Sequence, residues 1–166
     1  MYEERYAKEQ KTKYLTALKN VDISGSKVLD VGCGSGLFFR EVTAKSEMII
    51  GVDISRKLLL KAKKQADRFE NVAVLQADAD SLPLKDNSFD VIFAFTVLQN
   101  IPKPAVTLRE LMRVAKLGGR VVVTGLKKAF PFNKFMDILE GSGMNIISFF
   151  DNADLNCYVA ILDSGM

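Results

Sequence analysis

Short apolar runs alternate with helical patterns from residue 27 onward, and this alternation limits the fold more than any other feature of the chain. Apolar runs of this length are typical of buried strands. We expect strands at 27–31, 48–52, 72–76, 90–97 and 120–124, with helices between them at 37–45, 56–69 and 102–116. Strands that alternate with helices form right-handed crossovers. The pattern therefore predicts an α/β fold with a parallel sheet and helices on both faces.

The two ends of the chain extend this pattern. A further helix is expected at 131–140, followed by strands at 145–150 and 157–162. The short link between these strands favours an antiparallel pair. Residues 1–20 are predicted to form one helix. We thus expect a single domain over 1–166, with a Rossmann-like core at 27–166. Its doubly wound, mostly parallel seven-stranded sheet would end in an antiparallel strand pair.

The composition is that of a soluble globular protein. The 166 residues are 48% hydrophobic and 26% charged, and no apolar run approaches the roughly 18 residues of a membrane span. Residues 1–20 are charged throughout and do not resemble a secretory signal. The two cysteines, Cys33 and Cys157, lack the spacing of a zinc site or a disulfide framework. The expected location is the reducing cytoplasm, with no membrane contact.

The chain contains no histidine, which excludes several kinds of chemistry. The chain can form no Ser–His or Cys–His nucleophile pair and no His-ligated metal site, and it lacks the commonest general base. We therefore expect no metal. The net charge of +3 carries little information, because the densest basic run, Arg56 to Lys64, fits the solvated side of a helix. Nucleic acid stays open as a partner, although the charge pattern lends it no support.

Three glycines, Gly32, Gly34 and Gly36, lie between the first strand and the first helix. Glycines at such a turn permit positive φ and let a ligand approach the backbone. Taken alone, the turn also fits a tight connection without a ligand. The nicotinamide-dinucleotide fingerprint would place its third glycine at Leu37. A nicotinamide-binding module is therefore a disfavoured alternative.

Acidic residues follow the strands at the edge where ligands bind. Asp53 lies 21 residues after Gly32, a spacing that suits hydrogen bonds from ribose hydroxyls. Asp30, Asp78 and Phe95 also fall at or just past strand ends, where the crevice of an open α/β sheet lies. A lone Asp53 would fit an acid that stabilises a helix N-terminus. The whole set favours a nucleotide-like ligand.

Four ordered segments resemble the class I S-adenosylmethionine-dependent methyltransferases. Residues 28–36 (VLDVGCGSG) are similar to the first motif of that family and residues 51–55 (GVDIS) to the second. Residues 78–92 resemble the third motif and its following strand, and residues 111–120 resemble the helix and turn before the fifth strand. The resemblance implies S-adenosyl-L-methionine as cofactor and methyl transfer to an acceptor.

The resemblance also implies roles at the methionine end of the cofactor. Backbone groups around Gly32 and Cys33 would hold the amino group and the carboxylate. Gly34 and Gly36 would let the cofactor lie close to the chain. Asp30 would support the methionine end, directly or through water.

For the adenosine part, the resemblance implies that Asp53 takes the ribose hydroxyls and Ile54 packs on the adenine. Asp78 would accept a hydrogen bond from the adenine amino group, with the backbone of Ala79 beside it. Asp80 is a rival for this role, but the distance to the Leu-Pro pair at 82–83 favours Asp78.

Phe95 and Gln99 would line the sulfonium end, where the acceptor enters. Methyl transfer from a sulfonium mainly requires alignment, and a base is needed only if the acceptor keeps its proton during attack. No catalytic residue is therefore assigned. Relatives that methylate nucleobases or glutamine often carry an Asn/Asp-Pro-Pro-aromatic run after the fourth strand. Residues 95–102 lack it, which lowers the odds of amide or exocyclic amine acceptors.

Aromatic residues outside these motifs admit two interpretations. Tyr2 and Tyr6 share a helix face, so they could close over the cofactor or pack the helix onto the sheet. Phe130, Phe132 and Phe135 could cover an acceptor pocket, although core packing is favoured for Phe135. No long insertion follows the fifth strand. We therefore expect an open acceptor side, suited to a macromolecule or covered by a partner subunit or a second copy. A non-catalytic cofactor-binding subunit is the second function considered.

Overall fold

The computed structural model describes residues 1–165. Its strands are β1 (Lys27–Val31), β2 (Met48–Asp53), β3 (Val72–Gln76), β4 (Phe89–Ala94), β5 (Ala115–Leu126), β6 (Asn145–Phe150) and β7 (Cys157–Asp163). Its helices are α1 (Tyr2–Leu18), α2 (Phe39–Val42), α3 (Arg56–Ala66), α4 (Pro104–Val114) and α5 (Phe132–Glu140), with a short 3₁₀ helix η1 (Leu98–Asn100). No helix in residues 1–165 is long and apolar enough to cross a membrane.

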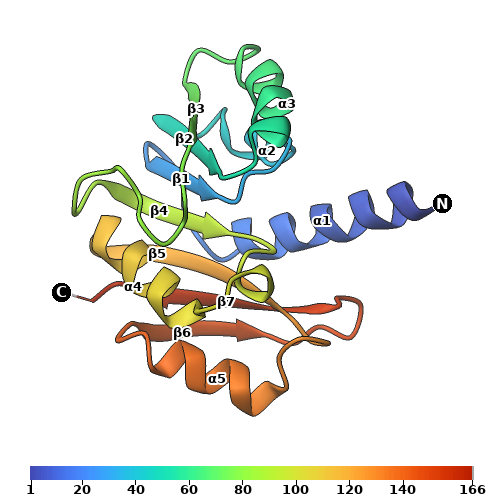
Figure 1. Ribbon diagram of the computed structural model, residues 1–166, viewed down its shortest axis with the longest axis vertical. Helices are drawn as coiled ribbons and strands as arrows, with labels where there is room; N and C mark the ends of the chain where they lie inside the picture. The colour runs from blue at the N-terminus through green and yellow to red at the C-terminus, as the bar shows by residue number, and fades with distance from the viewer. Residues whose placement is uncertain (166) are drawn as a thin grey trace.

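The seven strands form one sheet in the order β3-β2-β1-β4-β5-β7-β6 (Figure 1). The strands β1 to β5 pair in parallel, and β7 runs antiparallel to both β5 and β6. This arrangement confirms the predicted fold class and the antiparallel pair at its end. The chain moves outward from β1 to β2 and β3, then returns to β4 on the other side of β1. Ligand crevices of α/β sheets open at such a reversal, at the carboxyl ends of the strands.

Alternating side chains of the strands feed two hydrophobic clusters, one on each face of the sheet. In β1, Leu29 belongs to a cluster with the buried residues of α4 and α5. Its neighbour Val28 belongs to the second cluster, with buried residues of α1, α2 and α3. The helices thus cover both faces, as predicted, and α1 extends away from the sheet at its N-terminal end (Figure 1).

The fourth strand and helices α2 and α3 are shorter than predicted. The helix expected at 37–45 covers only Phe39–Val42, and α3 ends at Ala66 rather than 69. The strand expected at 90–97 ends at Ala94, because the backbone turns at Thr96, whose φ is +62°. This conformation is rare for a β-branched residue. Two hydrogen bonds hold it: the Thr96 N–H donates to Thr124 Oγ1 at 2.8 Å, and Asn100 Nδ2 donates to the Thr96 carbonyl at 3.0 Å.

The connection between α4 and β5 also differs from the prediction. Gly118 follows the helix predicted at 102–116 at a position typical of a C-cap glycine, but α4 ends at Val114 and β5 begins at once. The pairing with β4 passes from Phe89–Ala115 to Val91–Arg120, so residues 116–119 loop out of the ladder. Gly118 has positive φ inside this loop and not at a helix end. A glycine that follows a helical pattern is the usual C-cap signal, which explains the error.

Candidate cofactor and acceptor site

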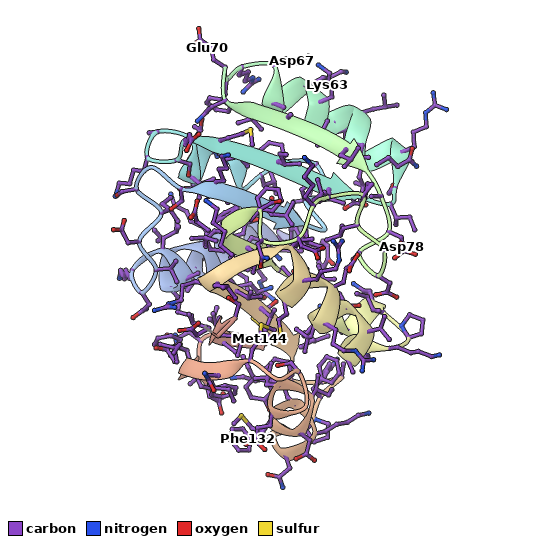
Figure 2. The ribbon with its side chains drawn as sticks, turned by 90° about the vertical axis from the view of Figure 1, so that its left-hand side faces the viewer. Lys63, Asp67, Glu70, Asp78, Phe132 and Met144 are labelled. Carbon is purple, nitrogen blue, oxygen red and sulfur yellow. The ribbon has the colours of Figure 1, made fainter. Side chains whose placement is uncertain are left out.

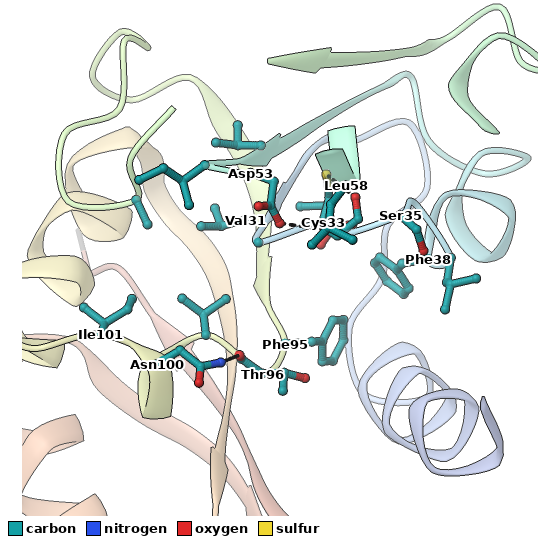
Figure 3. Close-up of a pocket in the computed structure, with 18 of the residues that line it drawn as sticks. Val31, Cys33, Ser35, Phe38, Asp53, Leu58, Phe95, Thr96, Asn100 and Ile101 are labelled. Carbon is teal, nitrogen blue, oxygen red and sulfur yellow. Dashed lines mark hydrogen bonds between the residues drawn. The ribbon is translucent and has the colours of Figure 1, made fainter. Parts of the chain in front are cut away.

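A cavity of about 760 Å³ opens at the carboxyl ends of β1, β2 and β4 (Figure 3). This volume suits a cofactor-sized ligand. Nine of the eleven predicted cofactor residues line it: Asp30, Gly32, Cys33, Gly34, Asp53, Ile54, Asp78, Ala79 and Phe95. Gly36 and Gln99 are not among the lining residues. The parallel sheet therefore brings together residues that are widely separated in sequence, because their strands end at the same edge.

Asp53 ties the glycine turn to the end of β2. Its Oδ2 accepts a hydrogen bond from the Gly34 N–H at 2.9 Å, and its Oδ1 accepts from the Ser55 N–H at 2.8 Å. Gly34 has φ of +56°, and a Cβ built there would meet no atom within 4 Å. The turn at Gly34 therefore faces open space in the cavity while its amide is fixed by the Asp53 carboxylate.

Asp30 is a buried carboxyl at the end of β1, with a relative exposure of 3%. Its Oδ2 has no hydrogen-bond partner within residues 1–165. Burial, with a smaller contribution from the charge of Asp53, raises the pKa of Asp30 to about 8. A buried acceptor without a donor costs free energy, and a strongly perturbed carboxyl in a cleft is typical of a functional site. Asp30 is thus suited to receive a donor or a positive charge from a ligand.

Gly36 packs the turn against its neighbouring helices. A Cβ at Gly36 would lie 2.7 Å from the ring of Phe39 and 3.2 Å from Ala62 Cα. Protein atoms therefore occupy the space where a side chain at residue 36 would lie, and this position does not face the cavity. A glycine motif alone does not distinguish a glycine that faces a ligand from one that faces a helix.

Gln99 lies in η1 beside the cavity-lining Asn100. The Gln99 Oε1 atom is buried and unpaired in the described chain. Asn100 holds the carbonyl of Thr96, and both residues are drawn in Figure 3 with this hydrogen bond. If the strand expected at 90–97 had continued, alternate side chains would have pointed toward the cavity. The turn at Thr96 and helix η1 replace the end of that strand and change which side chains line the cavity.

Helix α1 supplies one wall of the cavity. Tyr6, Gln10 and Tyr14 are four residues apart, lie on one helix face and all line the cavity. The sequence singled out Tyr6 with Tyr2, but Tyr2 is 82% exposed and is not a lining residue. The period-four spacing of these side chains was available in the sequence. Which face of α1 meets the cavity was not.

Aromatic rings fill the space between α1 and β4. The ring centroid of Tyr14 lies 4.7 Å from that of Phe38 and 5.0 Å from that of Phe95. Burial raises the pKa of the Tyr14 phenol and of the Cys33 thiol well above their ordinary values. Both groups therefore keep their protons at neutral pH. Cys33 is therefore a protonated side chain of the turn, which does not suit a thiolate nucleophile.

The loop that carries Asp78 and Asp80 is held by α4. Thr107 Oγ1 donates to Asp80, and Arg113 donates to the Leu82 carbonyl at 2.9 Å. Within the loop, the Asp80 N–H donates to Asp78 Oδ1 at 2.9 Å. Sequence reasoning missed Thr107 and Arg113, which hold the loop in place from α4 and do not themselves line the cavity. Both carboxylates line the cavity, so the preference for Asp78 stays a prediction.

The three phenylalanines at 130, 132 and 135 do not cover the cavity. Phe135 is fully buried, and its ring lies 5.3 Å from that of Tyr158. Figure 2 shows Phe132 at one end of the molecule, away from the loop that carries Asp78. None of the three is a lining residue. The acceptor-roof interpretation is therefore wrong, and Phe135 packs in the core as the alternative predicted.

Comparison with known proteins identifies the family. A model of a methyltransferase domain matches residues 29–123, which is more than half of the chain. The chain belongs to the class I S-adenosylmethionine-dependent methyltransferases. A demethylmenaquinone methyltransferase of Staphylococcus saprophyticus is 35% identical over 118 residues, covering 69% of this chain and 51% of the relative. A Staphylococcus aureus enzyme of the same name is 38% identical over 101 residues, covering 59% and 42%. The chain thus spans about half the length of these curated relatives.

Solved structures show the same fold. A methyltransferase from Aquifex aeolicus superimposes with a TM-score of 0.80 at 23% identity, covering 90% of this chain and 88% of that one. A structure of the Haloferax volcanii Trm112 methyltransferase activator in complex with a methyltransferase gives 0.80 at 17% identity, covering 100% and 92%. Family and fold together imply S-adenosyl-L-methionine as the cofactor, as predicted.

The cavity residues fit this cofactor. The buried, unpartnered Oδ2 of Asp30 offers an acceptor for an ammonium group such as that of the methionine part. The open space over Gly34 leaves room for a ligand against the backbone. These two features of the apoprotein lie on either side of Gly32 and Cys33, in the segment of the first family motif.

Proposed function

We propose that this chain transfers a methyl group from S-adenosyl-L-methionine to an acceptor, and that the cavity at the ends of β1, β2 and β4 binds the cofactor. The observation that carries the proposal is Asp30, a buried carboxyl with an unpartnered oxygen on the cavity wall. When bound, the cofactor supplies a methyl group on a sulfonium, which an aligned nucleophile can take.

The lining residues suggest how each part of the cofactor is held. The two oxygens of Asp53 each accept one backbone hydrogen bond and keep lone pairs for ribose hydroxyls. Ile54 is 66% exposed at the cavity edge, which suits an apolar side chain that packs on adenine. Asp78 with Ala79 would recognise the adenine edge. Backbone groups at Gly32 would hold the methionine end.

Alignment rather than proton abstraction is the proposed contribution of this chain to the reaction. The chain has no histidine, and the buried phenol of Tyr14 stays protonated because burial raises its pKa. Well-oriented reactants can gain roughly 7–11 kcal/mol from pre-organisation alone. The buried rings of Phe38 and Phe95 would exclude water from the reacting end.

Calorimetry tests the proposed cofactor site. We expect S-adenosylmethionine and S-adenosylhomocysteine to bind and NAD not to bind. Asp53→Ala removes the carboxylate and should weaken S-adenosylhomocysteine at least tenfold. The matched control is Asp67→Ala, which removes an exposed carboxylate that pairs with Lys63 of α3 (Figure 2). NAD binding without a response to S-adenosylhomocysteine would refute the proposal.

A non-catalytic, cofactor-binding subunit is the second candidate function. The Haloferax volcanii neighbour, in complex with an activator, bears only on whether a protein of this fold binds a partner. Transfer of radiolabelled methyl to acceptors by the purified chain alone distinguishes the candidates, because a subunit of this kind binds the cofactor without transfer. The curated relatives are named for demethylmenaquinone. Since the chain spans about half of their length, we carry over the methyl transfer and not that acceptor.

A further inference from the structure

The turn that follows β4 has a backbone conformation that its own residue disfavours. Thr96 lines the cavity with φ of +62°, in the left-handed region that β-branched residues rarely adopt. Such strain persists only where the surrounding structure holds it, and it is common at functional sites. Because β4 ends at Ala94, residues 95–97 leave the sheet and form part of the cavity wall. The groups that hold Thr96 therefore shape the cavity.

Thr124 of β5 is one of these groups, and it lies outside the cavity. The parallel pairing of β4 with β5 ends at Ala94 and Val123. Just beyond this pair, the Thr124 side chain takes the place of a backbone acceptor, since its Oγ1 accepts from the Thr96 N–H at 2.8 Å. Thr124 is 1% exposed and is not a lining residue. It is therefore placed to act on a bound ligand only through the turn at residues 95–97.

The second group that holds Thr96 is Asn100. Its Nδ2 donates to the Thr96 carbonyl at 3.0 Å, in the hydrogen bond drawn in Figure 3. This bond is exposed to solvent, whereas the bond from Thr96 to Thr124 is partly buried. Water can replace an exposed partner, but a buried N–H that loses its acceptor stays unpaired at a cost in free energy. The Thr124 hydroxyl is thus the more important of the two supports.

Val97 connects this turn to the glycine turn after β1. A Cβ built at Gly32 would lie 2.5 Å from Val97 Cγ2, so Val97 packs where any side chain at Gly32 would be. Val97 is itself buried. From the other side, β2 holds the glycine turn, because the Cys33 N–H donates to the Val52 carbonyl at 2.9 Å. The glycine turn therefore lies between β2 and Val97, and a shift of Val97 would change the space at Gly32.

We propose that Thr124 is a positioning residue for the methionine end of the cofactor. By fixing Thr96, its hydroxyl keeps Val97 packed on Gly32. This inference rests on the proposed cofactor site, in which backbone groups at Gly32 hold that end. Without the hydroxyl, the Thr96 N–H loses its acceptor and the turn can relax from its strained conformation. The adenosine side keeps its own hydrogen bonds, at Asp53 and in the loop after β3.

The test compares S-adenosylhomocysteine with 5′-methylthioadenosine by calorimetry. Both ligands contain the adenosine and the sulfur, but only the first has the amino-acid part. Thr124→Val keeps the shape of the side chain and removes the hydroxyl. It should weaken S-adenosylhomocysteine by about tenfold, as expected when a buried donor is left unpaired. It should leave 5′-methylthioadenosine unchanged, which also shows that the variant is folded. Thr124→Ser retains the hydroxyl and should bind both ligands as the parent does.

A second variant tests the route through Val97. Val97→Ala removes the methyl groups that pack on Gly32, so it should weaken S-adenosylhomocysteine and not 5′-methylthioadenosine. If Thr124 acts through Val97, adding Thr124→Val to Val97→Ala should cause little further loss. Two changes that share one route are not additive, whereas independent ones are.

Thr107→Val is the matched control, because it removes another buried hydroxyl, which donates from α4 to Asp80 on the adenosine side. It should change both ligands by the same factor, since both carry adenosine. The positioning role is overturned, and the proposed function spared, by equal changes of the two ligands in Thr124→Val, by Thr124→Ser binding as weakly as Thr124→Val, or by additive losses in the double variant. Failure of S-adenosylhomocysteine to bind the parent overturns both.

Discussion

Replacing Asp30 with asparagine should change how the stability of the apoprotein depends on pH. The pKa of Asp30 is about 8 in the folded chain, because of burial and the nearby charge of Asp53, against an ordinary value of 3.8. Between these two values the unfolded chain ionises and the folded chain does not. Protons are therefore lost on unfolding, and stability falls as pH rises through this window. Asp30→Asn has no charge to gain and should lack this slope.

The size of the effect follows from the width of the window. Each pKa unit corresponds to about 1.4 kcal/mol, and pH 5 and pH 7 both lie inside the window. Over these two units, the free energy of unfolding of the variant should rise relative to the parent by about 2–3 kcal/mol. Urea unfolding at pH 5, 6 and 7 measures this difference. Asp137→Asn, at an exposed position of α5, should run parallel to the parent.

Cofactor binding should shift the same proton. A methionine ammonium beside Asp30 favours the ionised carboxyl, so binding at pH 7 should release a proton from the parent. Asp30→Asn should release none. The number of protons follows from binding enthalpies of S-adenosylhomocysteine in two buffers with different heats of ionisation. A variant whose stability difference from the parent is flat between pH 5 and 7 would refute the idea that burial keeps this carboxyl protonated.

Two further substitutions test the parts of the site that do not touch a ligand. Gly36→Ala should lower the free energy of unfolding by about 1–3 kcal/mol more than Gly118→Ala. Both glycines have positive φ, but only at Gly36 would a Cβ meet neighbouring atoms. Urea unfolding measures the difference, and equal losses in the two variants would contradict the packing argument. Arg113→Met should weaken S-adenosylhomocysteine severalfold by releasing the loop at Leu82. Arg120→Met, which breaks a bridge to the far end of β7, should not, and calorimetry distinguishes the two.

The sequence could predict which of the proposed cofactor residues line one cavity, because they lie at or just after the ends of apolar strands. In a parallel sheet, the carboxyl ends of the strands lie along one edge. A residue at the end of a strand in the sequence is therefore also at the edge of the cavity. Asp30 and Asp53 were located in this way from β1 and β2 without knowledge of tertiary contacts. The strand and helix boundaries that were predicted wrongly depend on residues far away in the sequence. The turn at Thr96, for example, depends on the hydroxyl of Thr124 in β5.

The α1 wall of the cavity could not be predicted, because it depends on where α1 docks. Glu9 accepts hydrogen bonds from the backbone and side chain of Asn156, at 3.3 and 3.1 Å, more than 140 residues away. This contact beside β7 helps to fix which face of α1 meets the cavity. A charged helix with several aromatic residues gives no strong signal of its own buried face. The sequence pattern therefore pointed to Tyr2 and Tyr6 and not to Gln10 and Tyr14.

The two sides of the cavity, one formed by strand ends and one by α1, restrict the sequence to different degrees. The motifs lie in turns that follow strands, where the backbone must bend toward the cofactor and where Asp53 must reach the Gly34 amide. Such geometry tolerates few residue types. The wall on α1 needs only side chains of suitable size at positions four apart, such as Gln10 and Tyr14. The motifs in the sequence therefore report the side of the cavity formed by the strand ends, whereas the α1 wall leaves no motif that the sequence alone reveals.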